Sequence, residues 1–202
     1  MAGERIRLFA ALDLPEEVRG ALVRWRAPLL AAEPRLLRPV ASDALHVTLC
    51  FLGQVDAAEA GAIGAAVVAS AGGDAPGGLA GEPGPVPGLA LADALWLPRR
   101  AARVLAVELV DAGGALARLQ ARVAGALTAG GWFEPEARPF LPHVTVARVR
   151  ARGNERAARE LAAAPLPGVP SLAFDGAAVT LYRSHLGGGG ARYEPLARAD
   201  LR

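Results

Sequence analysis

The sequence contains a single cysteine and no lysine, and it lacks any long run of bulky apolar residues. The one cysteine, Cys50, excludes an internal disulfide framework and any metal site built from several cysteines. Much of the 52% hydrophobic content is alanine, and no stretch approaches the ~18 bulky apolar residues of a membrane-spanning helix. The first residues include Glu4, Arg5 and Arg7 where a secretory signal would be apolar, so we expect a cytoplasmic protein.

Arginine supplies all 22 basic residues, and the 20 acidic residues leave a net charge of only +2. The guanidinium group is the better bidentate partner for phosphate. A gene whose coding bias favours Ala, Gly, Pro and Arg together would produce the same enrichment. The charge balance therefore does not by itself indicate a nucleic-acid-binding protein. A length of 202 residues allows one sizeable domain or two small lobes.

Apolar residues recur with strand or helix periodicity along most of the chain. Segment 5–8 alternates polar and apolar residues as a strand does, and Pro15 suits the first position of a helix. The Gly/Pro-rich stretch 72–88 favours irregular structure, and the glycines of 187–190 are expected to lie in a loop between two strands. We predict strands over 5–12, 44–52, 94–97, 104–110, 140–149, 172–181 and 192–196, and helices over 15–32, 57–70, 114–129 and 154–164.

The sequence repeats itself at a spacing of 97 residues. This shift places His46 on His143 and Thr48 on Thr145, and it aligns leucines of the preceding strand and helix. Each half then contains a strand, a helix, a second strand carrying the repeated motif and a second helix, which predicts two lobes of the same build. The predicted boundaries are 1–202 for a single bilobal domain, 5–72 and 103–164 for the lobe repeat, and 172–196 for the C-terminal strands.

Two of the three histidines open a His-Val-Thr motif, His46–Leu49 in the first half and His143–Val146 in the second. Because side chains alternate along a strand, each motif presents an imidazole and a hydroxyl on one face and apolar residues on the other. One such motif is usually only the polar face of a strand. Two motifs at equivalent places of a repeat, in a chain with four threonines, indicate function instead. The remaining histidine, His185, has no partner motif and is expected at the surface.

The segments LHVTLCFLG, PFLPHVTVAR and RLFAALDLP, with the C-terminal LYRSHLGGGGARYEPL, resemble the two-histidine phosphoesterase superfamily. Within it they are most similar to the RNA 2′,3′-cyclic phosphodiesterases, which are also called 2′-5′ RNA ligases. The resemblance covers essentially the whole chain. It implies an α/β (α+β) fold of two pseudo-symmetric antiparallel-sheet lobes with flanking helices, and a central cleft where the motifs meet. One departure is Cys50, where relatives often carry a basic residue.

The resemblance implies metal-independent hydrolysis of RNA 2′,3′-cyclic phosphate to a 2′-phosphate, with the reverse 2′-5′ ligation as a related reaction and no cofactor. His46 would protonate the leaving 3′ oxygen and His143 would activate water, although the repeat alone allows the roles to be exchanged. Imidazoles suit both tasks because they titrate near neutral pH. Thr48, Thr145 and Arg148 would bind the phosphate. The expected partners are RNA ends or nucleotides with a cyclic phosphate, and we expect a monomer.

Arg148 lies five residues after His143, and on a regular strand this odd offset would place its side chain on the opposite face. Arg148 can reach the phosphate only if the strand ends or twists near Ala147, or if the side chain wraps around the edge. Otherwise it is a solvated arginine among Arg150 and Arg152.

Two other functions remain open. The same chemistry could act on small cyclic nucleotides or 2′-5′-linked oligonucleotides. A non-catalytic RNA- or nucleotide-binding module is the alternative from another class, but such a module has little use for two imidazoles.

Overall fold

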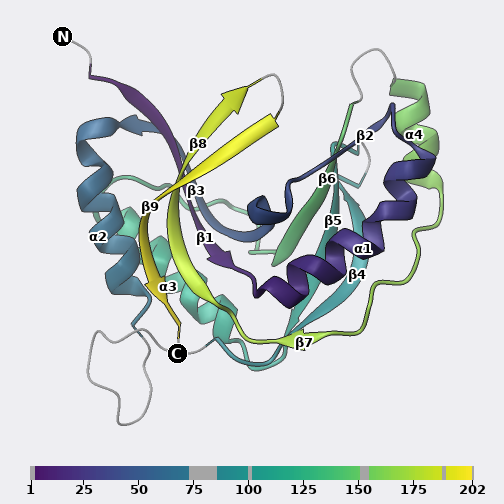
Figure 1. Ribbon diagram of the computed structural model, residues 1–202. Coiled ribbons are helices and arrows are strands. Elements are labelled where there is room, and N and C mark those ends of the chain that lie inside the picture. Colours follow the sequence, from purple (N-terminus) through teal and green to yellow (C-terminus); the bar gives the residue numbers. More distant parts are fainter. Residues whose placement is uncertain (1–2, 73–85, 100–101, 151–154, 188–189, 202) are drawn as a thin grey trace.

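The computed structural model describes residues 3–72, 86–99, 102–150, 155–187 and 190–201. They form strands joined by helices (Figure 1). The strands are β1 (Arg5–Asp13), β2 (Leu37–Pro39), β3 (His46–Asp56), β4 (Leu89–Leu97), β5 (Val104–Asp111), β6 (His143–Val149), β7 (Ala173–Phe174), β8 (Ala178–Gly187) and β9 (Gly190–Asp200). The helices are α1 (Glu16–Ala32), α2 (Ala60–Ser70), α3 (Ala115–Ala129) and α4 (Glu155–Ala163), with 3₁₀ turns η1 (Ser42–Ala44) and η2 (Ala57–Glu59).

All nine strands belong to one curled antiparallel sheet in the order β7-β4-β5-β6-β3-β1-β8-β9, with β2 added to β6 (Figure 1). The strands at the centre of this sheet, β3 and β6, share very little pairing. They are joined through one residue pair, Val47 with Val144. The sheet therefore has two halves, β7-β4-β5-β6 with β2 and β3-β1-β8-β9, which meet at the two motif strands. The predicted fold of two antiparallel-sheet lobes is confirmed.

Each half of the sheet is covered by helices from both halves of the sequence. Helix α1 packs against β2 and β6, whereas α3 packs against β3 and α2. Figure 1 shows α2 and α3 together on one side of the molecule and α1 with α4 on the other. The predicted lobe ranges thus describe a repeat along the sequence, while the spatial halves exchange α1 and α3.

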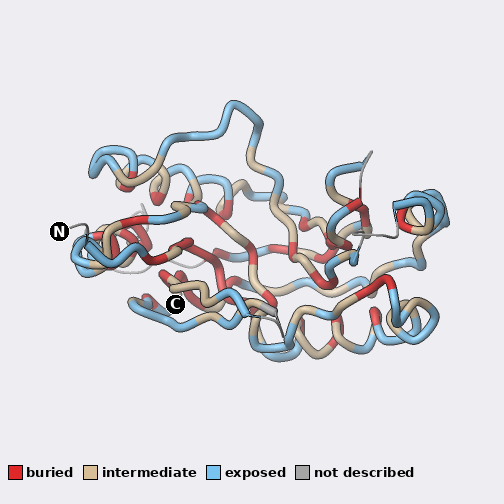
Figure 2. The backbone as a smooth tube through the Cα atoms, turned by 90° about the horizontal axis from the view of Figure 1, so that it is seen from above, coloured by how far each residue is buried: buried red, intermediate tan, exposed pale blue. Residues whose placement is uncertain are grey.

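The core lies between the sheet and these helices, and Figure 2 shows buried positions gathered where the strands cross the middle of the molecule. Helix α3 buries one apolar face, which consists of Leu116, Leu119, Val123 and Leu127. Asp56 caps the start of the predicted helix 57–70, which begins as the 3₁₀ turn η2, because its carboxylate accepts a hydrogen bond from the Ala58 N–H at 3.0 Å. No helix in the described ranges is long and apolar enough to cross a membrane.

Several predicted boundaries were wrong. Strand β3 passes Gly53, whose φ of 70° suits glycine, and continues to Asp56. Strand β8 runs to Gly187 and β9 begins at Gly190, so the predicted loop between them is much shorter. The predicted strand 172–181 is divided between β7 and β8, and β6 begins later than expected, at His143. Residues 73–85 of the irregular segment expected at 72–88 lie outside the described residues, as does Asn154, expected as the N-cap of the helix over 154–164.

Candidate active site

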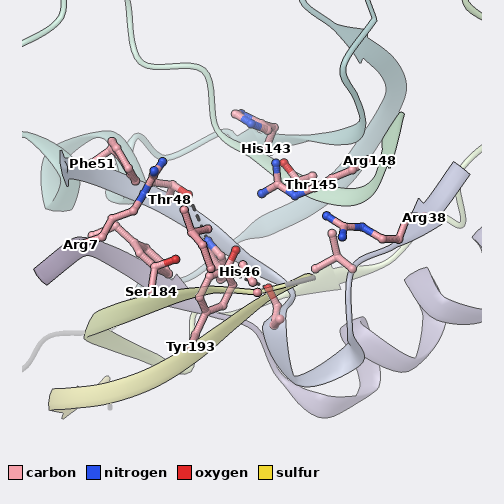
Figure 3. A pocket seen from close by; sticks show the side chains of 16 residues that line it. Arg7, Arg38, His46, Thr48, Phe51, His143, Thr145, Arg148, Ser184 and Tyr193 are labelled. Atoms are coloured by element: carbon pink, nitrogen blue, oxygen red, sulfur yellow. Dashed lines mark hydrogen bonds between the residues drawn. The ribbon is translucent and has the colours of Figure 1, made fainter. Parts of the chain in front are cut away.

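The five site residues predicted from the sequence line one cleft of about 280 Å³. Figure 3 shows them facing each other across it, His46 and Thr48 from β3 and the other three from β6. The β8–β9 hairpin forms a further wall through the register pair Ser184 and Tyr193. The residues brought together are His46, Thr48, His143, Thr145 and Arg148.

The odd position of Arg148 is explained by a β-bulge in β6. Opposite β5, Thr145 pairs with Ala106 and Ala147 pairs with Leu105, so Val146 is an extra residue. Val146 and Ala147 are therefore both buried in succession, and the next residue returns to the cleft side. A bulge re-aims the side chains that follow it, which places Arg148 on the same face as His143 despite the offset of five.

Strand β3 contains a β-bulge at the equivalent position. Opposite β1, Thr48 pairs with Ala11 and Cys50 with Ala10, which leaves Leu49 as the extra residue. The two strands then have identical burial over six residues, and each ends in an exposed residue that lines the cleft. In β3 this residue is Phe51, the counterpart of Arg148 in the repeat.

Both imidazoles are oriented in the same way by the backbone. The Nδ1–H of His46 donates to the Ala44 carbonyl, and that of His143 donates to the Leu141 carbonyl, each at 2.8 Å. This bond fixes the neutral tautomer in which Nε2 accepts. The Nε2 of His46 lies 3.1 Å from the Thr48 Oγ1, whose hydroxyl donates to it. Each histidine is thus free to exchange a proton through Nε2.

His46 is enclosed by aromatic rings. Phe9 stacks on its imidazole with ring centroids 4.8 Å apart, and Tyr193 meets it edge-on at 5.3 Å. Burial lowers the pKa of His46 to about 4, although the Ala44 hydrogen bond and the Asp13 charge act in the opposite direction. In the free protein His46 is therefore neutral at pH 7.

Asp13 is a buried carboxylate beside His46, its register partner across β1 and β3. One oxygen accepts from the Thr180 hydroxyl at 2.8 Å and pairs with Arg198, and the other accepts from the Tyr182 hydroxyl at 2.8 Å. These donors satisfy the carboxylate and hold it as a fixed negative charge near the imidazole.

The sequence reasoning did not find Asp13 or Phe9, and it did not find the cleft arginines Arg7 and Arg38. An acidic residue at the end of an otherwise apolar strand was a usable signal for Asp13. No sequence pattern distinguished Phe9 from a core residue, because it lies within an apolar run. His185 lies outside the cleft lining and pairs with Glu194 on the neighbouring strand, its Nε2 2.7 Å from a carboxylate oxygen.

Cys50, the departure from the family pattern, is buried behind the cleft, and burial raises the pKa of its thiol to about 12. It therefore stays protonated and does not act as a nucleophile at neutral pH. Within the described ranges no group of three or more His, Cys, Asp or Glu side chains is placed to hold a metal ion.

Comparisons with known proteins show which family the chain belongs to. A family model described as LigT like Phosphoesterase matches residues 12–72. The RNA 2′,3′-cyclic phosphodiesterase of Escherichia coli (strain K12) is 34% identical over 196 residues, which cover 96% of each chain. The crystal structure of E. coli LigT complexed with 3′-AMP superposes with a TM-score of 0.74 at 31% identity, covering 98% of this chain and 99% of that one. The protein TT0787 of Thermus thermophilus superposes with a TM-score of 0.68 at 27% identity, covering 98% of each.

The two-lobed sheet with paired His-Val-Thr motifs in one cleft defines a two-histidine phosphoesterase. The 34% identity to the E. coli enzyme over nearly the full length of both chains then identifies the family within this class. The protein belongs to the LigT-like phosphoesterase family.

Proposed function

We propose that this protein hydrolyses RNA 2′,3′-cyclic phosphate termini to 2′-phosphomonoesters, with His46 and His143 as a metal-independent acid–base pair. The observation that carries the proposal is the matched pair of imidazoles, each held through Nδ1 by a backbone carbonyl and each beside a threonine in one cleft. The name of the E. coli relative, RNA 2′,3′-cyclic phosphodiesterase, supports the substrate class.

In the proposed reaction, one neutral imidazole accepts a proton from water at Nε2 while the water oxygen forms a bond to phosphorus. The bond from phosphorus to the ribose 3′ oxygen breaks, and the other imidazole, in its protonated form, donates a proton to that oxygen. The 2′-phosphate remains. The family resemblance assigns the donor role to His46 and the acceptor role to His143, and the symmetric geometry is compatible with this assignment.

The donor role requires His46 to gain a proton, although burial keeps it neutral in the free protein. A bound cyclic phosphate is an anion, and a nearby negative charge favours the protonated imidazole. Protonation changes Nε2 from acceptor to donor, which releases the hydroxyl of Thr48 to bind a phosphate oxygen. Substrate binding would therefore both protonate His46 and free the Thr48 hydroxyl to bind the phosphate.

Negative charge grows on the non-bridging oxygens as water attacks, and it needs donors that are already in place. Thr48 and Thr145 supply hydroxyl groups from the two sides of the cleft, and Arg148 supplies a guanidinium. Attack on the same phosphorus by the 5′ hydroxyl of an RNA strand, in place of water, would use the same groups: the bond to the 3′ oxygen breaks as the bond to the 5′ oxygen forms, which joins the strands through a 2′-5′ bond. We further propose that the protein acts as a monomer, since all five site residues come from one chain, and that it acts in the cytoplasm.

The proposal is tested with RNA and mononucleotides that end in a 2′,3′-cyclic phosphate. We expect conversion to the 2′-phosphate, identified by ³¹P NMR, in the presence of excess chelator. His46→Ala and His143→Ala should each lower kcat/KM by about 100-fold or more. The double variant should be little worse than either single variant, because the pair acts as a unit. A 3′-phosphate product, loss of activity on chelation, or near-normal activity of either alanine variant would contradict the proposal.

A further inference from the structure

The cleft holds more positive charge than the reacting group requires. A 2′,3′-cyclic phosphate carries one negative charge, whereas Arg7, Arg38 and Arg148 all line the cleft. None of the described side chains that line it is a carboxylate. The arginines lie at both ends, Arg7 beside Phe51 and the other two beyond Thr145 (Figure 3).

Arg38 and Arg148 form an unusual pair of like charges. They are direct register partners across the antiparallel strands β2 and β6, so their side chains leave the same face of the sheet. Like charges directly opposite each other are destabilising in a sheet. Across the part of the chain that the structure describes, neither guanidinium has an ion pair or hydrogen bond to another side chain. A bound anion would remove this repulsion.

The positions of the two arginines separate their roles. Arg148 is on β6, the strand of the second motif, whereas Arg38 is one strand further from the histidines, on β2. Both side chains extend toward the cleft from the same end (Figure 3). If Arg148 contacts the reacting phosphate, Arg38 is placed to bind an anion next to it.

At the other end of the cleft, Arg7 already has a partner. Its guanidinium lies over the Phe51 ring, 4.5 Å from the centroid. This cation–π contact holds Arg7 beside Phe51, at the end of the cleft away from Arg148 (Figure 3). Arg38, the register partner of Arg148, is therefore the better candidate for a phosphate next to the reacting one.

We infer that Arg38 binds the phosphodiester that precedes the terminal nucleotide, so that the preferred substrate is an oligonucleotide and not a mononucleotide. This inference rests on the proposed function. A guanidinium suits this group because its planar fork matches phosphate oxygens and it stays charged at all physiological pH values.

The test compares a 2′,3′-cyclic mononucleotide with a dinucleotide that ends in the same cyclic phosphate. The wild-type protein should favour the dinucleotide by about 10-fold or more in kcat/KM, the range expected for one charge-assisted hydrogen bond. A dinucleotide with an uncharged methylphosphonate linkage should lose this preference. Arg38→Gln should lower the ratio of the two kcat/KM values toward one. Arg35→Gln is the matched control, since Arg35 is exposed three residues away and does not line the cleft.

An unchanged ratio in Arg38→Gln would overturn the inference, whether neither substrate is affected or both lose activity equally. Loss of the preference in Arg7→Gln but not in Arg38→Gln would overturn it as well. Calorimetric binding of a 3′-phosphorylated dinucleotide and mononucleotide to the wild type and Arg38→Gln provides a readout without turnover. If the wild type cleaves neither cyclic substrate, the proposed function fails. The binding comparison would then still decide whether Arg38 contacts the second phosphate.

Discussion

The surroundings of His46 oppose its positive charge. Its folded pKa of about 4 lies below the ordinary value of 6.5, with burial as the main cause. Between these two values the unfolded chain binds a proton that the folded protein does not. The free energy of unfolding contributed by His46 is therefore fully present above pH 6.5 and is lost as the pH falls toward 4.

We expect His46→Gln to flatten this pH dependence. The wild type should lose up to about 3 kcal/mol through His46 between pH 6.5 and 4, and the glutamine variant should not. Urea denaturation at closely spaced pH values measures the difference. Equal slopes for wild type and His46→Gln would show that His46 is already solvated in the fold.

Arg148 provides the second prediction at this scale. If its fork binds the phosphate as charge develops, Arg148→Lys should lower kcat/KM by about 10-fold, because a point charge replaces a planar donor. Arg148→Ala should lower it by about 100-fold. Arg150→Ala is the matched control, as Arg150 is exposed two residues further on and does not line the cleft. Unchanged kcat/KM in Arg148→Ala at low salt would show that Arg148 is a solvated arginine that does not bind the phosphate.

Strand alternation correctly predicted which faces His46, Thr48, His143 and Thr145 use, because each motif spans only three residues. It could not place Arg148. The extra residue Val146 reverses the alternation, and a bulge is recognised by pairing with another strand rather than by composition.

At the scale of the elements, α1 holds the β6 bulge in place. Arg26 is buried in this helix, and its guanidinium donates to the carbonyl of Val146, the extra residue. The same carbonyl accepts from the Val40 N–H at 3.1 Å. Burial lowers the pKa of Arg26, which shows that this contact is made at some cost in solvation.

We therefore expect Arg26→Met to affect both stability and activity. Loss of a hydrogen bond from a charged donor should lower the free energy of unfolding by about 2 kcal/mol. The bulge would also be less well fixed, so kcat should fall even where the protein remains fully folded. Arg24→Met, an exposed change on the same helix, should alter neither quantity. Urea titration and steady-state kinetics under conditions where both variants stay folded separate the two effects; loss of stability with an unchanged kcat would limit Arg26 to a structural role.

Elements with their own apolar pattern were predictable, as β1, α1 and α3 show. Strand β2 was not, because Leu37, Arg38 and Pro39 carry no periodic signal and become a strand only by pairing with the edge of β6. The missed strand is also the one that carries Arg38. For the same reason, the extension of β8 through His185 follows from its long pairing with β9 rather than from its composition.

At the scale of the whole molecule, the repeat predicted two similar halves but not how they are assembled. Nothing in the sequence indicates that α1 would pack on β6 and α3 on β3. This exchange of helices ties each half of the sheet to the other half of the chain. The direct link between the two halves of the sheet is nevertheless the single pair Val47 and Val144, each next to a catalytic candidate.

The last prediction concerns this link. Val144 is fully buried, and Val144→Ala should lower the free energy of unfolding by about 2 kcal/mol through lost burial and a residual cavity. It should also lower kcat, because the β3–β6 pair sets the spacing of the two imidazoles, and proton transfer at both ends of the reaction depends on that spacing. Val67→Ala is the matched control, since Val67 is equally buried in α2 and is remote from the β3–β6 pair. Both variants should unfold at lower urea concentration, whereas only Val144→Ala should lose activity while folded. Equal kcat values for the two variants would mean that the exchanged helices, and not the paired valines, hold the two halves of the site in register.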